Sequence, residues 1–259
     1  MKRVLAIGVL LVGLCRADMA AAQGDIAKRL ASTGELRVGL IGSNAVLITR
    51  GPDGQYRGIA VELAQRLAAK LGVPLKMIPH ETAGLYAESL KTGGWDLVMS
   101  GRDPTRAEFV VFSDPYLEIE SLYLARPGLD LESADQVDRA GTRIVVISGG
   151  SQDNYLSRSL KQATLVRVKN GAEAKEALLS GRADVLGATG PGVYALAAEV
   201  AGSNVLAGRF SIVEQTIGLP KRNADLLTYI GEFLRDAKES GFVADQIRRA
   251  GLKGVRPAP

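Results

Sequence analysis

Cysteine and histidine are almost absent from this 259-residue chain, which contains one of each. The cysteine, Cys15, falls in an N-terminal segment that we expect to be removed, which leaves no thiol for disulfides, nucleophilic catalysis or metal binding. His80 stands alone, which argues against a histidine-built zinc site and against a Ser-His-Asp triad. We interpret His80 as a structural or solvent-facing residue in a turn after residues 76–78. We expect no metal, no cofactor and no catalytic residue.

Long apolar runs are also scarce, and the one that stands out is Val4–Leu14. It is shorter than the roughly 20 residues that span a bilayer. Lys2 and Arg3 precede it and the small residues 20–22 follow it, which is the layout of a secretory signal peptide cleaved before Gln23. Residues 1–22 are therefore predicted to be a signal peptide and the mature protein to be free in the periplasm. A membrane anchor is the alternative.

The excess of positive charge is small. The whole chain carries a net charge of +4, and removing residues 1–22 takes away three basic residues and one acidic residue, which leaves +2. Basic residues are spread along the chain without interleaved aromatics, and aromatics make up 5% of it. This pattern argues against nucleic acid as a partner. The apolar share of 46% is ample for a core, and the length suits one large domain or two small lobes.

Hydrophobic periodicity predicts two α/β units in succession. In each unit, short apolar runs typical of buried strands alternate with segments of helical period, which predicts mainly parallel sheets. Apolar runs between and after the units predict strands that cross from one unit to the other and back. Acids at a helix start mark residues 130–137, and residues 254–259 are expected to fray. The predicted strands are 36–41, 73–78, 97–99, 118–124, 143–147, 164–168, 183–186 and 212–219, and the predicted helices are 25–32, 59–71, 85–92, 153–161, 172–179, 224–240 and 245–250.

Polar residues follow the strand 97–99 in the stretch Asp96–Tyr116, where the chain turns through Ser100 and Gly101 and then presents Arg106. Ligands bind beyond the carboxyl ends of parallel strands, and a guanidinium can hold a carboxylate with two hydrogen bonds. The sequence therefore favours an anion site at Arg106. The alternative for a single arginine is a solvated surface charge.

A second turn, Ser148–Gln152, lies between a predicted strand and a predicted helix. Amide groups at a helix N-terminus bind anions, so Ser151 and Gln152 are candidate ligand contacts. Ser151 or Asp153 can equally act as a helix N-cap, and both roles can hold at the same corner.

The motifs in order resemble the periplasmic solute-binding proteins of ABC transporters for polar amino acids, family 3 with the type II fold. The resemblance runs through nearly all of residues 34–252 and marks a divergent member. It implies two lobes, each a mainly parallel sheet flanked by helices, joined by a two-crossing hinge. It places residues 23–118 and 211–259 in lobe 1 and residues 119–210 in lobe 2. It is carried by Gly34–Gly39, Asp53-Gly54, Gly58–Gly72, Ser100-Gly101 with Arg106, Phe112–Tyr116 and Leu178–Asp184.

The resemblance also implies site residues. The ligand α-carboxylate would meet Arg106 and the turn containing Ser151. Thr189 stands where amino-acid-binding members carry the acid that holds the ligand ammonium, and Leu47 and Ala83 stand where they carry aromatics. We therefore expect an anionic solute, carrying a carboxylate, with no obligatory α-amine, unless Asp103, Asp114 or Glu118 supplies the missing charge. The candidate ligand-binding residues are Ser100, Gly101, Arg106, Gly150, Ser151, Gln152, Thr189, Leu47, Ala83 and Tyr116.

Three functions follow from this resemblance. The first is a monomeric receptor that closes on a small solute and delivers it to an ABC permease in the inner membrane. The second is an enzyme on the same scaffold, like the relatives that dehydrate a cyclic, prephenate-type carboxylic acid. We do not expect this function, because it needs a general acid in the cleft and no candidate stands out. The third is an accessory binding protein for a sensor or a periplasmic redox enzyme.

Overall fold

The computed structural model describes residues 23–259. The predicted signal peptide, with Cys15, lies outside the described residues. Within residues 23–259 no helix is long and apolar enough to cross a membrane.

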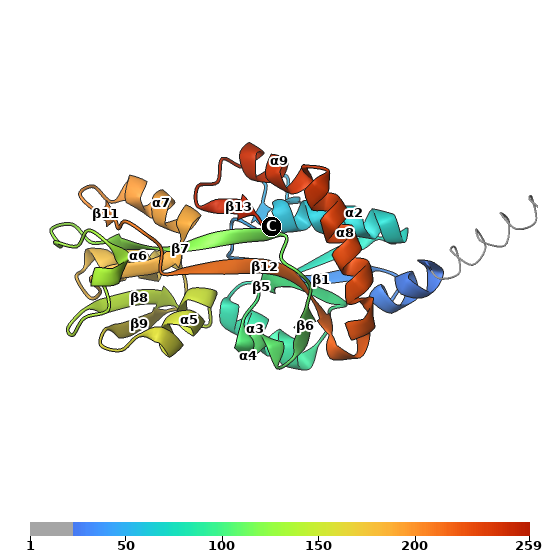
Figure 1. Cartoon of the computed structure of the whole chain (residues 1–259), viewed down its shortest axis with the longest axis horizontal. Helices are drawn as coiled ribbons and strands as arrows, with labels where there is room; N and C mark the ends of the chain where they lie inside the picture. The colour runs from blue at the N-terminus through green and yellow to red at the C-terminus, as the bar shows by residue number, and fades with distance from the viewer. Residues whose placement is uncertain (1–22) are drawn as a thin grey trace, which may run out of the picture.

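A mixed sheet of eleven strands runs the length of the part that the structure describes (Figure 1). Its main path is β4-β1-β5-β12-β7-β10-β8-β9, with β6 beside β12 and with β11 and β13 beside β7. The strands β2 and β3 form a separate hairpin. The bounds are β1 Leu36–Ile41, β2 Thr49–Arg50, β3 Tyr56–Arg57, β4 Leu75–His80, β5 Leu97–Gly101, β6 Val110–Phe112, β7 Leu117–Ala125, β8 Arg143–Ile147, β9 Thr164–Val168, β10 Val185–Thr189, β11 Asn204–Val205, β12 Ser211–Pro220 and β13 Val255–Pro257.

Helices flank this sheet, and their ends follow local sequence signals. In α2, Ile59–Leu71, apolar residues recur at helical spacing, and Gly72 ends it in the left-handed conformation (φ 70°) that glycine adopts without strain. Thr82 caps α3, Ala83–Thr92, by accepting a hydrogen bond from the Leu85 amide. The other helices are α4 Pro104–Ala107, α5 Ser151–Ser159, α6 Gly171–Leu179, α7 Gly190–Glu199, α8 Leu227–Glu239 and α9 Phe242–Arg249, with 3₁₀ turns at Ala134–Gln136 and Lys221–Leu226. Residues 23–30 are also helical.

The buried apolar residues fall into two groups along the sheet. One group comes from residues 30–119 and 213–247, and the other from residues 122–206. We name these parts lobe 1 and lobe 2. Their exact boundaries stay a proposal that this distribution of cores supports.

Two long strands join the lobes. In β7, residues 117–119 pair with β13 and residues 121–125 pair with β10 of lobe 2. In β12, residues 215–218 pair with β5 of lobe 1, and residues 211–215 pair with β7. The two strands cross the centre of the molecule side by side (Figure 1). This is the predicted two-crossing hinge of a mixed α/β fold.

Several predicted elements differ from the structure. The tail is not frayed, because Val255–Pro257 forms β13 against β7. The acids at 130–137 begin only a short 3₁₀ turn. The helix expected over 153–161 begins two residues earlier, at Ser151. His80 lies at the end of β4, not in a turn after residue 78.

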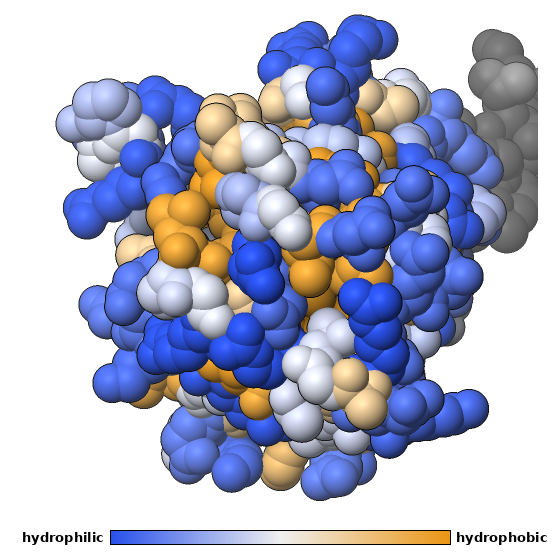
Figure 2. Space-filling view, turned by 90° about the vertical axis from the view of Figure 1, so that its left-hand side faces the viewer, coloured by the Kyte–Doolittle hydropathy of each residue, from blue (hydrophilic) through white to orange (hydrophobic). Residues whose placement is uncertain are grey.

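The outer end of lobe 2 is covered mainly by hydrophilic residues, with apolar residues showing between them (Figure 2). Two of the large apolar side chains exposed in this lobe are Leu179 and Tyr194. Scattered apolar residues of this kind are ordinary on a solvated protein surface. This end of the molecule therefore does not bear on the position of the ligand site.

Candidate functional site

Arg106 lies at the boundary between the lobes, where a short helix presents it. The strand β5 ends at Gly101, and Asp103 begins α4 by accepting a hydrogen bond from the Thr105 amide at 2.9 Å. Pro104 occupies the first turn, where its missing N–H costs nothing. This turn directs the Arg106 side chain inward, and the residue is only 3% exposed.

The Arg106 guanidinium donates hydrogen bonds to both lobes. Its Nη1 lies 2.9 Å from the Gly101 carbonyl of lobe 1 and 3.3 Å from the Ser151 hydroxyl of lobe 2. Its Nη2 lies 3.4 Å from the Gly149 carbonyl of lobe 2. Its Cζ stands 5.5 Å from the centroid of the Tyr86 ring, within the range of a cation–π contact. Arg106 therefore links the two lobes directly.

The lobe 2 side of this contact is the N-terminus of α5. Gly149 takes a positive φ of 71°, and the Asp153 carboxylate accepts its amide hydrogen at 2.9 Å, which holds the turn in place. Gly150 is the N-cap residue and Ser151 is the first residue of the helix. The positive end of the α5 dipole thus lies beside the positive charge of Arg106. Such an arrangement favours an anion between them.

No carboxylate neutralises Arg106 within residues 23–259, because the nearby acids have other partners. Asp103 accepts from Arg158 at 3.0 Å and Asp153 accepts from Arg167 at 2.9 Å. Glu118 pairs with Arg256 at 2.5 Å. Asp114 is exposed to solvent. The acids that we considered as substitutes for the missing ammonium contact are thus paired or solvated.

The structure brings some predicted site residues together and buries others. Gly101, Arg106 and Ser151 meet directly, and Ala83 lies beside the turn, since a Cβ placed on Gly149 would come within 3.8 Å of its Cβ. Gln152 donates to the Ser121 hydroxyl at 3.0 Å, and the Cα of Thr189 is the β-register partner of that Ser121. Ser100, Tyr116 and Leu47 are at most 2% exposed, and both Tyr116 and Leu47 pack in the lobe 1 core.

Gly101 is required at the contact between the lobes. A Cβ placed there would lie 2.4 Å from Val213 Cγ1 and 3.0 Å from the Ser151 hydroxyl. A neighbouring residue of β12, Gln215, brings its amide nitrogen within 3.5 Å of the same point. Sequence reasoning did not include Gln215 or Tyr86 in the site. Neither residue lies in a motif, so only their positions in the fold reveal them.

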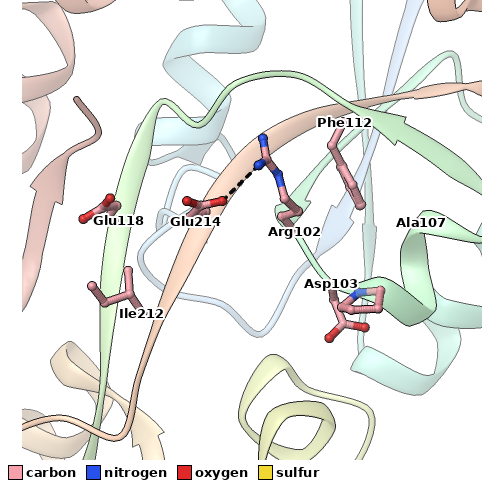
Figure 3. Close-up of a pocket in the computed structure, with 8 residues that line it drawn as sticks. Arg102, Asp103, Ala107, Phe112, Glu118, Ile212 and Glu214 are labelled. Atoms are coloured by element: carbon pink, nitrogen blue, oxygen red, sulfur yellow. Dashed lines mark ion pairs between the residues drawn. The ribbon is translucent and has the colours of Figure 1, made fainter.

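A hollow on the surface lies beside this contact. It has a volume of about 480 Å³ and opens where α4 faces β7 and β12, and Arg102 there reaches Glu214 at 3.3 Å (Figure 3). Its lining excludes Arg106 and the Gly149–Ser151 turn. We place the site at Arg106 because the buried charge lies there. The hollow is lined by Arg102, Asp103, Pro104, Ala107, Phe112, Glu118, Ile212 and Glu214.

The pKa values near the site follow burial. Burial raises the pKa of the Tyr86 phenol above its usual value, although the neighbouring Arg106 charge and Ser100 act in the opposite direction. Burial also raises the pKa of Tyr116. Both phenols are therefore protonated at neutral pH and can donate a hydrogen bond. Burial lowers the pKa of His80, which keeps that imidazole neutral.

Comparison with known proteins identifies the fold and the family of this chain. The two lobes and the crossing strands are those of the type II periplasmic-binding-protein fold. The chain belongs to the bacterial extracellular solute-binding proteins, family 3, whose profile matches residues 36–249.

Individual relatives are distant and differ in function. Cyclohexadienyl dehydratase of Pseudomonas aeruginosa is 27% identical over 169 residues, which cover 64% of this chain and 63% of the dehydratase. The L-cystine-binding protein TcyJ of Escherichia coli K12 is 25% identical over 225 residues, 85% of this chain and 84% of that protein. The solved structure of the ancestral amino acid-binding protein AncCDT-1, a precursor of cyclohexadienyl dehydratase, has a TM-score of 0.73 at 25% identity and covers 86% of this chain and 98% of its own.

Proposed function

We propose that this protein is a periplasmic receptor that closes its lobes on a small carboxylate and delivers it to an ABC permease. The solute carries an anionic group for Arg106 and has no obligatory α-amine. Membership of the solute-binding family supports the binding role. The resemblance of residues 1–22 to a signal peptide supports the periplasm as the location.

The observation that carries this proposal is that the positive charge of Arg106 is buried without a negatively charged partner. The side chain is almost fully buried, and its three hydrogen-bond partners are neutral oxygens. Burying a charge without an opposite charge is costly, and a carboxylate bound beside the guanidinium would remove that cost. The N-terminus of α5 would add a favourable interaction with the same anion.

The ion pairs of the nearby acids support the proposal that the solute has no obligatory α-amine. A ligand ammonium buried between the lobes would need a carboxylate to offset its lost hydration. Thr189 offers a hydroxyl at the position of that acid, and this hydroxyl already accepts from the Gly192 amide as the cap of α7. Asp103 and Glu118 are held by arginines. A ligand with an uncharged group in place of the ammonium avoids this cost.

Closure follows from the position of the site. Because Arg106 is buried by groups from both lobes, a solute can reach it only when the lobes separate. The strands β7 and β12 are continuous through both lobes, so bending them would open and close the cleft. The bound solute would then bridge the lobes and stabilise the closed form.

A dehydratase is the second candidate, and the similarity to cyclohexadienyl dehydratase favours it. That chemistry also begins with a carboxylate substrate, so Arg106 would serve both functions. It additionally needs a general acid beside the leaving group. The acids near Arg106 are already engaged in ion pairs with arginines. An accessory role, with a sensor or redox enzyme as the partner, would use the same ligand site.

Thermal unfolding tests the proposal. Residues 23–259 are refolded to remove bound solute and heated with carboxylates, α-amino acids and a prephenate-type acid. A ligand at about 100 times its Kd adds roughly 2.7 kcal/mol to stability. We expect carboxylates without an amine to raise the Tm. Stabilisation by α-amino acids alone would overturn the ligand class, and consumption of the prephenate-type acid would identify an enzyme.

A further inference from the structure

Two residues in the region of Arg106, Tyr86 and Gln215, have a buried polar atom without a hydrogen-bond partner. Within residues 23–259 the buried side-chain atoms that lack a partner are His80 Nε2, Tyr86 OH, Tyr116 OH and Gln215 Oε1. The last three belong to residues that are at most 2% exposed. Buried polar groups in folded proteins are nearly always hydrogen-bonded, so such a group indicates a partner that completes the site.

Tyr86 and Gln215 approach Arg106 from two different elements. Tyr86 projects from α3, and its ring lies against the Arg106 guanidinium. Gln215 lies on β12 directly opposite Gly101 of β5, whose carbonyl accepts from Arg106. The Gln215 amide and the Ser151 hydroxyl both lie within 3.5 Å of the position that a Gly101 Cβ would take.

The backbone amide of Tyr116, the third of these residues, donates to the Gln215 carbonyl at 2.9 Å. The unpartnered atoms of Tyr86 and Gln215 offer one phenol donor and one amide acceptor. Each of these groups is neutral.

We propose that Tyr86 and Gln215 bind the substituent on the carbon next to the ligand carboxylate, and that this substituent is a hydroxyl. The ligand class is therefore the 2-hydroxycarboxylates. This inference rests on the proposed function, because it assumes that the carboxylate occupies the Arg106 site.

The chemistry of the two groups selects a hydroxyl. A hydroxyl can donate to Gln215 Oε1 and accept from the Tyr86 phenol at the same time. A hydrogen atom at that carbon would leave both protein groups unpartnered, which disfavours the plain acid. An ammonium would bring a charge that neutral groups cannot offset, and it cannot accept from the phenol.

Matched triples of ligands test this inference. In each triple only the substituent on carbon 2 changes between hydroxyl, hydrogen and ammonium. The triples are lactate, propionate and alanine; malate, succinate and aspartate; and 3-phenyllactate, 3-phenylpropionate and phenylalanine. Binding to refolded residues 23–259 is measured by titration calorimetry. We expect the 2-hydroxy acid of the best triple to bind about tenfold tighter than its plain acid.

Two variants assign the preference to its residues. Gln215→Leu removes the amide acceptor and keeps a side chain of similar size. We expect this variant to bind the hydroxy acid and the plain acid about equally (about onefold preference). Its affinity for the plain acid should stay within about threefold of the wild-type value. Tyr86→Phe removes only the phenol and is expected to reduce the preference about threefold. The exposed Gln65 and the hairpin residue Tyr56 provide the controls Gln65→Leu and Tyr56→Phe.

The outcomes separate this inference from the proposed function. If the wild-type protein binds none of the nine compounds, the proposed function fails and the inference fails with it. If it binds carboxylates but prefers the plain or the amino acid, the proposed Arg106 site stands and the inference is wrong. A hydroxyl preference that survives in both Gln215→Leu and Tyr86→Phe also overturns the inference.

Discussion

Asp103 of lobe 1 and Arg158 of lobe 2 form an ion pair across the cleft, with 3.0 Å between Oδ2 and Nη2. The carboxylate is 4% exposed, and its other oxygen accepts from Asn154 Nδ2 at 3.2 Å and from the Thr105 amide at 2.9 Å. Both partners in lobe 2 project from α5, the helix whose N-terminus faces Arg106. We name Asp103, Asn154 and Arg158 the interlobe clasp, because their side chains join the two lobes directly.

Removing the clasp charge should open the ligand-free protein. Asp103→Asn keeps an oxygen that can cap α4 and accept from Asn154, but it loses the attraction to Arg158. We expect amide exchange in residues 151–159 to become about tenfold faster. We also expect a larger radius of gyration by small-angle X-ray scattering. Hydrogen exchange followed by mass spectrometry measures the first effect.

A matched control exists for this variant. Asp53 pairs with Arg57 at 2.6 Å, and both side chains are at least half exposed in the β2–β3 hairpin. Asp53→Asn should leave the exchange of α5 and the radius of gyration unchanged. If Asp103→Asn behaves like this control, the clasp does not hold the lobes together.

Thr189→Asp should give the protein an affinity for α-amino acids. Thr189 caps α7, and aspartate is an equally good cap, so the helix should be retained. The added carboxylate would stand where related amino-acid binders hold the ammonium. We expect alanine, aspartate or phenylalanine to raise the Tm of this variant more than that of the wild type. Thr189→Asn keeps the cap without the charge, and an equal gain in that variant would show that charge is not the cause.

Asp184 should make lobe 2 sensitive to acid. It accepts hydrogen bonds from Arg143 at 2.9 Å and from Arg126 at 3.2 Å, and the Arg143 contacts above all hold its pKa below the usual value. A carboxylate whose pKa is lowered by folding stabilises the folded protein. This stabilisation is complete above the unfolded-state pKa of about 3.9, and it is lost as the pH falls through the folded-state pKa. We expect Asp184→Asn to cost about 2 kcal/mol at pH 7.

Denaturant unfolding between pH 7 and pH 2 measures this loss. The difference between the wild type and Asp184→Asn should shrink as the pH falls below about 4 and disappear below the folded-state pKa of Asp184, where both side chains are neutral. Asp225 pairs with Arg29 at the surface and is 63% exposed, so Asp225→Asn serves as the control. A constant difference across the pH range would show that the pairing is not the source of the stability.

Local patterns predicted much of the fold. The bounds of β1, α2, β8 and β9 agree with the predicted ranges, because each is an apolar run or a helical period with a clear end. The helix α7 was missed, because Gly190, Pro191 and Gly192 resemble a loop. Proline is nevertheless favoured in the first helical turn, where Pro191 stands. The strand β13 was missed because only pairing with β7 makes it a strand.

The candidate site was predictable only in part. Arg106 and Ser151 follow strand ends at short spacing, so a parallel α/β pattern was enough to suggest them. Tyr86 and Gln215 lie inside a helix and a strand, where their polarity has no local meaning. Their role depends on contacts with residues that are distant in the sequence and on buried polar atoms that have no hydrogen-bond partner. Leu47 and Ala83 were implied only by the resemblance to the family, and the structure buries both.

The central claim is that Arg106 binds the carboxylate of the solute. Titration calorimetry with the carboxylate that raises the Tm most should compare Arg106→Ala with Arg209→Ala. Arg209 pairs with Glu120 at the surface, so it provides a matched loss of one charge. We predict that Arg106→Ala weakens binding by about 100-fold or more, because two charge-assisted hydrogen bonds are lost, and that Arg209→Ala keeps the wild-type affinity. Equal affinity in a folded Arg106→Ala protein would contradict the account.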